Sequence, residues 1–135
     1  MENAACSFVL LDKDLHGLYK NKGFPNALQY DRDSARPEVL AAVAYDQEQI
    51  VGIACVSADS QTMWQIGVDV RPAYRGNGIG VKLVNMLTIE TLARGVVPYY
   101  TTHIANISSQ KVAVQSGYLP AWTHCFRNRL PTFHK

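Results

Sequence analysis

The chain is poor in cysteine and has no long apolar run. Its 135 residues include only three cysteines, Cys6, Cys55 and Cys125, without a Cys-x-x-Cys pair. This odd, scattered set suits neither a disulfide framework nor a zinc site. The apolar runs at 39–45 and 50–56 are far shorter than the ~20 residues that a membrane-spanning helix needs. The N-terminus lacks the basic start of a secretory signal. These absences predict a cytoplasmic protein with no metal and no membrane partner.

Charged residues are also few, at 18% of the chain, and their signs are segregated. Residues 1–64 carry five basic and nine acidic residues, whereas residues 65–135 carry eight basic and two acidic residues. A basic C-terminal half favours a polyanionic ligand, although a solvated surface explains the same pattern. Because the basic residues form no run and lie on no single helix, we do not expect nucleic acid as a partner.

The length of 135 residues and the hydrophobic content of 47% predict one globular domain over residues 1–135. Residues 1–38 are its least defined part. A strand or lead-in at 7–11 precedes a short helix around Leu15, Leu18 and Tyr19, and residues 31–37 form a polar loop.

Three β-rich segments follow at 39–45, 49–57 and 63–70, joined by short polar turns. Short connections join antiparallel neighbours, so the pattern predicts a three-stranded meander. In the third segment the residues that alternate onto the core face are Trp64, Ile66, Val68 and Val70. The opposite face carries Met63, Gln65, Gly67 and Asp69.

Beyond residue 78 the pattern alternates between helix and strand. Apolar spacing predicts a helix over 79–94 that ends before Gly95. A strand-like segment at 96–104 leads to Asn106, the expected N-cap of a shorter helix that ends at Ser116. A further strand is expected over 118–130. The fold class is therefore α/β (α+β), a mixed, mostly antiparallel sheet flanked by helices with one parallel crossover.

The most informative segment is the turn Arg75-Gly76-Asn77-Gly78-Ile79-Gly80, which joins a strand to a long helix. Glycines allow close backbone approach, and the N–H groups and helix dipole favour an anion such as a pyrophosphate. A Rossmann G-x-G-x-x-G motif fails because Val81 stands at the third glycine position. A Walker P-loop fails because Val81-Lys82-Leu83 follows Gly80 instead of Lys-Ser/Thr.

The turn resembles the Arg/Gln-x-x-Gly-x-Gly/Ala signature of the GNAT superfamily of N-acetyltransferases. The lead-in, Val68-x-Val70-x-Pro72-x-Tyr74, is typical of that family, and Asn106-x-x-Ser109 with Gly117-Tyr118 is similar to its second signature. The resemblance spans residues 39–123, and within the family the chain resembles an uncharacterised bacterial subgroup. It implies a splayed parallel strand pair that binds an acyl-CoA. Either residues 1–38 would be a reduced version of the family's usual N-terminal part, or the chain would be the C-terminal part of something longer.

The resemblance further implies transfer of an acetyl group from acetyl-CoA to a primary amine. Backbone N–H groups of the turn would bind the pyrophosphate, and the edge of the preceding strand would pair with the pantetheine amides. The cofactor-binding residues implied in this way are Val68, Val70, Arg75, Gly76, Asn77, Gly78, Ile79, Gly80, Val81, Asn106 and Ser109. No metal is implied.

The family's acid and base positions are not filled in the usual way. The tyrosine that many members place seven residues after the Asn corresponds to Ala113, and the glutamate some members carry falls near Trp64. Substitutes are His103 as base, Asp69 as a proton relay through water, and Ser109 or Tyr118 as donor to the thiolate. Each of these also has an ordinary structural reading.

Two functions therefore stay open. The first is an acetyl-CoA-dependent N-acetyltransferase acting on an amine of a small molecule or a protein, and the second is a non-catalytic acyl-CoA-binding module. A purely structural protein is the third reading, and failure to bind any coenzyme A species would favour it. An exposed sheet edge at the C-terminal strand would permit a homodimer.

Overall fold

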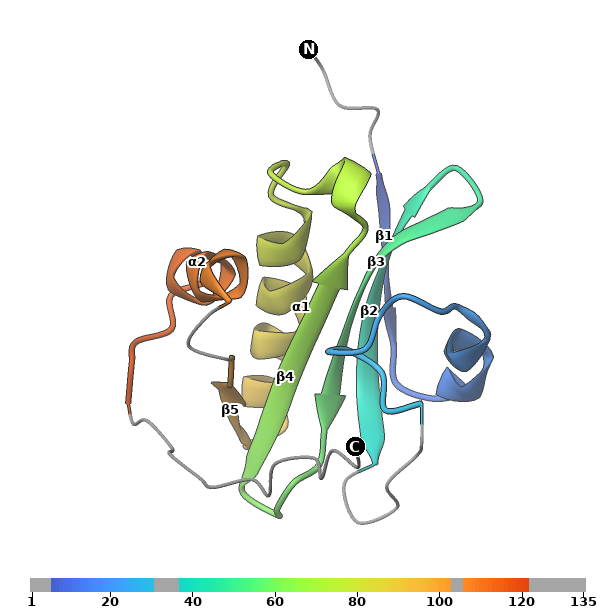
Figure 1. Ribbon diagram of the computed structural model, residues 1–135. Helices are drawn as coiled ribbons and strands as arrows, with labels where there is room; N and C mark the ends of the chain where they lie inside the picture. Colours follow the sequence, from blue (N-terminus) through green and yellow to red (C-terminus); the bar gives the residue numbers. More distant parts are fainter. Residues whose placement is uncertain (1–5, 31–36, 103–105, 122–135) are drawn as a thin grey trace, which may run out of the picture.

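The computed structural model describes residues 6–30, 37–102 and 106–121 (Figure 1). It contains a five-stranded sheet in the order β1-β2-β3-β4-β5. The strands are β1 (Ser7–Leu11), β2 (Glu38–Asp46), β3 (Gln49–Ser57), β4 (Met63–Val70) and β5 (Val97–Tyr100). Neighbouring strands from β1 to β4 are antiparallel, and β5 is parallel to β4. The expected meander and crossover are confirmed.

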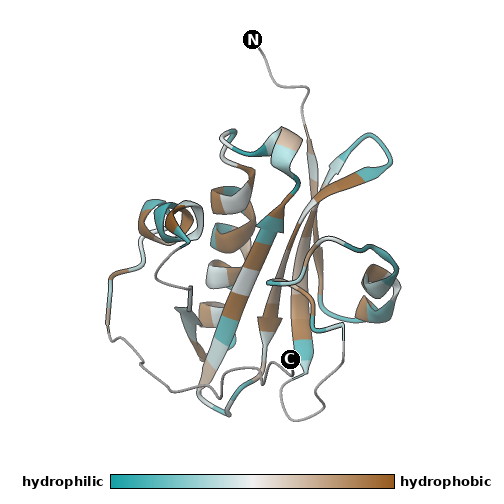
Figure 2. Ribbon diagram, in the orientation of Figure 1, coloured by the Kyte–Doolittle hydropathy of each residue, from teal (hydrophilic) through white to brown (hydrophobic). Residues whose placement is uncertain are grey.

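Helices cover one face of the sheet and a short N-terminal segment covers the other. Figure 1 shows α1 (Ile79–Ala93) behind the sheet with α2 (Ile107–Gln115) beside it. The 3-10 helix η1 (Leu15–Lys20) and the chain that follows it lie in front. In Figure 2 apolar residues recur along α1 and the central strands, whereas the turn between β4 and α1 is largely polar.

The central strands β2 and β3 are buried on both faces. One core joins α1 to the sheet and includes Leu40, Val56, Ile66, Leu83 and Leu87. The second joins η1 and its neighbours to the opposite face, with Leu15, Phe24, Leu28, Val43 and Ile53. The central strands therefore carry nearly continuous apolar runs, as strands buried on both faces do.

Two boundaries differ from the sequence expectation. The strand expected over 96–104 is limited to Val97–Tyr100, because pairing with β4 ends where Ile66 faces Tyr100. Of the strand expected over 118–130, residues 118–121 form no strand. Val96, Thr101 and Thr102 are described and belong to no strand, whereas residues 103–104 and 122–130 lie outside the described residues. The turn residues Gly117-Tyr118 instead close α2, since the Tyr118 N–H donates to the Ala113 carbonyl at 3.0 Å.

The segment between β1 and β2 is short. Its described part contains η1, of six residues, and no α-helix. Phe24 and Leu28 are fully buried and fix the chain after η1 against the sheet. The Arg71 guanidinium, just past the end of β4, lies 4.8 Å from the centre of the Phe24 ring and so also contacts this segment. Residues 31–36 lie outside the described part.

Candidate active site

The parallel strands β4 and β5 pair over only half of β4. Their register runs from Met63 opposite Val97 to Ile66 opposite Tyr100. In Figure 1, β4 continues past the end of β5 toward the start of α1. Within residues 6–30, 37–102 and 106–121, no strand pairs with the last four residues of β4 on this side. The two strands thus form a fork, defined here as residues 67–70 of β4 and the end of β5.

The fork exposes specific backbone groups. The Thr62 carbonyl accepts from the Val97 N–H at 2.8 Å, so the even-numbered residues of β4 direct their peptide groups toward β5. Past the end of β5, these groups belong to Val68 and Val70. The Val70 carbonyl accepts from Arg75 Nε at 3.0 Å, which leaves the Val68 peptide groups and the Val70 N–H facing the fork.

The turn after β4 leads directly into α1. Gly76 and Gly78 have φ of 82° and 78°, in the left-handed region that favours glycine, and both are exposed. Gly78 is the N-cap of α1, and no side chain caps this helix end. The Asn77 side chain donates to the Tyr74 carbonyl at 3.2 Å and shapes the turn. The result is an exposed helix N-terminus whose first N–H groups can receive an anion.

The first turn of α1 packs against both β4 and α2. Ile79 and Gly80 are buried, and Val81 is half-buried. A Cβ added at Gly80 would lie 3.4 Å from Val112 of α2 and 3.6 Å from Val70. Glycine at position 80 therefore allows α2 to approach the fork closely.

The start of α2 carries a pair of hydrogen-bonded hydroxyl groups. Asn106 is the expected N-cap, because its Oδ1 accepts from the Ser109 N–H at 3.0 Å. Ser109 Oγ and Tyr100 Oη are 2.6 Å apart, which ties α2 to the end of β5. Burial raises the pKa of Tyr100 above its ordinary value. Its hydroxyl therefore stays protonated at neutral pH.

Tyr118, which follows α2, forms a second hydroxyl pair with Thr88 of α1. Its Oη is 2.7 Å from Thr88 Oγ1, and its ring centre is 6.0 Å from that of Tyr100. Burial raises the pKa of Tyr118 as well. Thr88 Oγ1 in turn donates to the Val84 carbonyl at 2.8 Å, so this hydroxyl pair is anchored inside α1.

Asp69 anchors the segment of residues 24–28, called here the crossing segment. Its carboxylate accepts from the Asn26 N–H at 2.7 Å, from Asn26 Nδ2 at 2.7 Å and from the Ala27 N–H at 2.8 Å. Burial raises the pKa of Asp69, and these hydrogen bonds and the charge of Arg75 oppose the rise. Asp69 thus accepts three hydrogen bonds on its two oxygens and ties the crossing segment to β4.

Gly67 makes this crossing possible. A Cβ at position 67 would lie only 2.0 Å from the Asn26 carbonyl oxygen. Any other residue would push the crossing segment off β4. The pair Gly67 and Asp69 therefore places residues of the N-terminal part over the outer face of β4, next to the fork.

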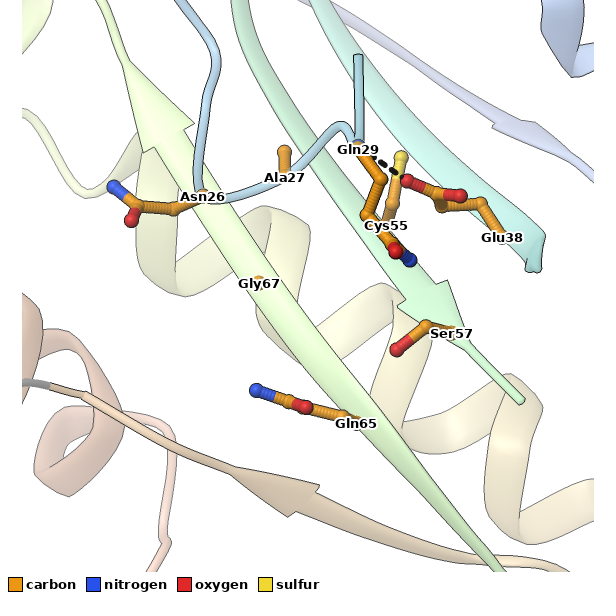
Figure 3. A pocket seen from close by; sticks show the side chains of 8 residues that line it. All are labelled: Asn26, Ala27, Gln29, Glu38, Cys55, Ser57, Gln65 and Gly67. Atoms are coloured by element: carbon orange, nitrogen blue, oxygen red, sulfur yellow. Dashed lines mark hydrogen bonds between the residues drawn. The ribbon is translucent and has the colours of Figure 1, made fainter. Parts of the chain in front are cut away.

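A cavity of about 190 Å³ lies beneath the crossing segment (Figure 3). Its walls come from that segment, from the start of β2 and from the outer faces of β3 and β4. The lining residues are Asn26, Ala27, Gln29, Glu38, Cys55, Ser57, Gln65 and Gly67. Gln65 Nε2 also hydrogen-bonds Thr101 Oγ1, just past β5, so the cavity adjoins the fork.

His103, the predicted base, lies outside the described residues. Within the described part of the chain, no three His, Cys, Asp or Glu side chains are grouped to hold a metal ion. No described helix is long and apolar enough to cross a membrane. Sequence reasoning missed Asn26, Glu38 and Gln65, and it did not pair the Tyr100 hydroxyl with Ser109. A glycine inside a strand, at position 67, was the one available signal of a close backbone approach.

Residues 7–118 match the model of the GNAT acetyltransferase family. The chain belongs to this family. No curated protein sequence matches the chain. The fork and the uncapped α1 N-terminus are thus features of a GNAT acetyltransferase, and the expectation from the two signatures is confirmed.

Solved structures show the same fold at low sequence identity. An aminoglycoside N-acetyltransferase, AAC(6')-Iy in complex with CoA, has a TM-score of 0.70 and 16% identity over 95% of this chain and 97% of its own. An aminoglycoside acetyltransferase from an uncultured soil metagenomic sample, in complex with sisomicin, gives 0.62 and 16% over 93% and 97%. A GCN5-related N-acetyltransferase-like protein from Streptococcus suis gives 0.66 and 24% over 87% and 47%.

Proposed function

We propose that this GNAT acetyltransferase transfers the acetyl group of acetyl-CoA to a primary amine by direct attack of the amine on the thioester. The observation that carries the proposal is the fork beside the exposed α1 N-terminus. The fork provides a strand edge that no described strand pairs with and that the pantetheine amides can join, and the α1 N-terminus provides N–H groups for the pyrophosphate.

The residues present fit this donor. Gly76, Asn77 and Gly78 lie in the exposed turn, and Ile79, Gly80 and Val81 supply the first N–H groups of α1. Val68 and Val70 would supply the strand edge, and the Val70 N–H, which faces the fork, would hold the oxyanion of the tetrahedral intermediate. A single donor of this kind contributes ~3–4 kcal/mol in other acyl-transfer enzymes. Asn106 and Ser109 border the fork from α2.

The reaction needs two proton transfers. As the amine nitrogen bonds to the carbonyl carbon, the nitrogen loses a proton, and the C–S bond breaks to give a thiolate that gains one. We assign the role of proton donor to the thiolate to the Tyr100–Ser109 hydroxyl pair. Ser109 and Ala113 lie four residues apart on one face of α2, so the pair stands one turn from the position of the family's usual tyrosine. His103 remains the predicted base.

The second candidate is a non-catalytic acyl-CoA-binding module. Ala113 and Trp64 favour it, because they stand where many family members carry the acid and the base. Both candidates bind acetyl-CoA, but only the first releases thiol in the presence of an amine.

Calorimetric titration with acetyl-CoA tests the donor site. Gly78 and Gly95 offer a matched pair, since their φ values are 78° and 76° and neither has an atom within 4 Å of an added Cβ. Valine therefore introduces the same backbone strain at both positions, but only Gly78 lies in the turn. We expect Gly95→Val to bind as the wild type does and Gly78→Val to bind at least about tenfold more weakly, a loss of ~1.4 kcal/mol. Equal binding by the two variants would refute the placement, and no binding by the wild type would refute the function.

A further inference from the structure

The cavity beneath the crossing segment is negatively charged. Glu38 is its one carboxylate, and the other polar side chains are the neutral amides of Gln29 and Gln65 and the Ser57 hydroxyl, whereas the Asn26 amide is turned away to Asp69 (Figure 3). None of the eight lining residues is Lys, Arg or His. Among the described residues no basic side chain forms an ion pair with Glu38. A carboxylate among neutral hydrogen-bonding groups favours a cation with donors, such as an ammonium group.

Glu38 is held in place for such contact. Its Oε1 accepts from the Gln29 N–H at 2.5 Å, and Figure 3 shows the carboxylate beside Cys55 at the upper wall of the cavity. Glu38 is half-buried at the first position of β2, so its backbone is fixed by the sheet. A carboxylate oriented by a backbone N–H keeps acceptor sites for a further partner.

Cys55 does not supply a nucleophile to this cavity. Burial raises the pKa of its thiol, and the negative charges of Glu38 and Asp69 raise it further. The thiol therefore stays protonated and serves as an apolar part of the wall. The same two carboxylates show that the potential around this wall is negative.

The position of the cavity connects it to the proposed reaction. Gln65 and Gly67 line it from the outer face of β4, and the next residue, Val68, presents its peptide groups to the fork. A volume of about 190 Å³ is below the ~300–1,000 Å³ of sites for drug-sized ligands. The cavity therefore accommodates a short aliphatic arm that bears one charged group.

We propose that this cavity binds a second ammonium group of the acceptor through Glu38, so that the acceptors of this enzyme are diamines or polyamines. The proposal rests on the proposed function, since it treats the fork as the place where the other amine reacts. The reacting amine must be neutral to attack, whereas the second one stays protonated and pairs with the carboxylate. Glu38 is thus a specificity-determining residue.

Cadaverine and pentylamine are suitable probes, because both are unbranched five-carbon amines and only the first has a second ammonium group. Binding of each is measured by calorimetry with free coenzyme A present, and kcat/KM is measured by thiol release from acetyl-CoA. We expect the wild type to favour cadaverine about tenfold in both assays. Glu38→Gln should remove the preference and leave acetyl-CoA affinity unchanged, because the amide oxygen can still accept from the Gln29 N–H.

Glu48→Gln is the matched control, since it removes the same charge from an exposed turn. It should keep the full preference for cadaverine. A wild-type ratio near one overturns the proposal, and so does a ratio that Glu38→Gln leaves unchanged. The proposal is also overturned if the wild type prefers a lysine-bearing peptide to cadaverine and Glu38→Gln keeps this preference. If the wild type fails to bind acetyl-CoA, the proposed function fails instead, and cadaverine binding to the protein alone still reports on the cavity.

Discussion

Substitution of Gly67 by alanine tests how the crossing segment is held on β4. The added Cβ would lie 2.0 Å from the Asn26 carbonyl oxygen and 2.9 Å from its carbonyl carbon. Real Cβ atoms essentially never approach another heavy atom closer than 3.0 Å, so the segment must move by about 1 Å. The obstacle is backbone, which cannot turn aside as a flexible side chain does.

The displacement breaks the contacts of Asp69. Its three hydrogen bonds measure 2.7 to 2.8 Å, and a shift of this size takes them beyond hydrogen-bonding distance. Overpacking costs about 1–3 kcal/mol, and loss of hydrogen bonds to a partly buried charge adds to this, with water replacing part of the loss at exposed Asn26. We expect Gly67→Ala to lower the free energy of unfolding by about 2–4 kcal/mol.

Urea denaturation followed by circular dichroism measures this loss, with Gly17→Ala as control. Gly17 is exposed in η1, and an added Cβ there meets nothing within 4 Å. The control should change stability by less than about 1 kcal/mol. Hydrogen exchange of the Asn26 and Ala27 amides should accelerate only in Gly67→Ala. If the two variants are equally stable, the crossing segment is not held as described.

Two further predictions concern α2 and its hydroxyl pair. Asn106→Ala should lower the free energy of unfolding by about 1 kcal/mol, because it removes the cap on the Ser109 N–H, and urea denaturation measures it; an unchanged value would contradict the cap. Burial raises the pKa of Tyr100 above 10.0, so the folded protein keeps this proton at a pH where the unfolded chain loses it. Stability should therefore fall as the pH rises through about 10, and Tyr100→Phe should reduce that fall; identical pH profiles in urea denaturation would contradict it.

The strands, α1 and the glycine-rich turn were predictable because each has a strong local signal. Alternation in residues 63–70 placed Asp69 on the face opposite Val68, and Gly78 marked a helix start with positive φ. The role of Asp69 was not predictable, since its partners are more than forty residues away in the crossing segment. The cavity was missed for the same reason: Glu38, Cys55 and Gln65 meet only through sheet register.

The end of β5 shows the limit of propensity in another way. Residues 96–104 are apolar and β-branched enough to favour a longer strand, yet pairing stops at Tyr100. Beside the end of this pairing, Val112 of α2 packs against Gly80 of α1, which is a tertiary contact with no local signal. The position of α2 also brings Ser109 next to Tyr100, so the contact between their hydroxyl groups could not be predicted from the local sequence.

The proposed reaction moves an acetyl group from acetyl-CoA to an amine. The most direct measurement mixes the protein with acetyl-CoA and a panel of amines, and follows free thiol together with the mass of each amine. We expect thiol release that depends on both protein and amine and matches the acetylated amine mole for mole. Saturable acetyl-CoA binding with no amine-dependent thiol release across the panel would contradict it and leave the binding module.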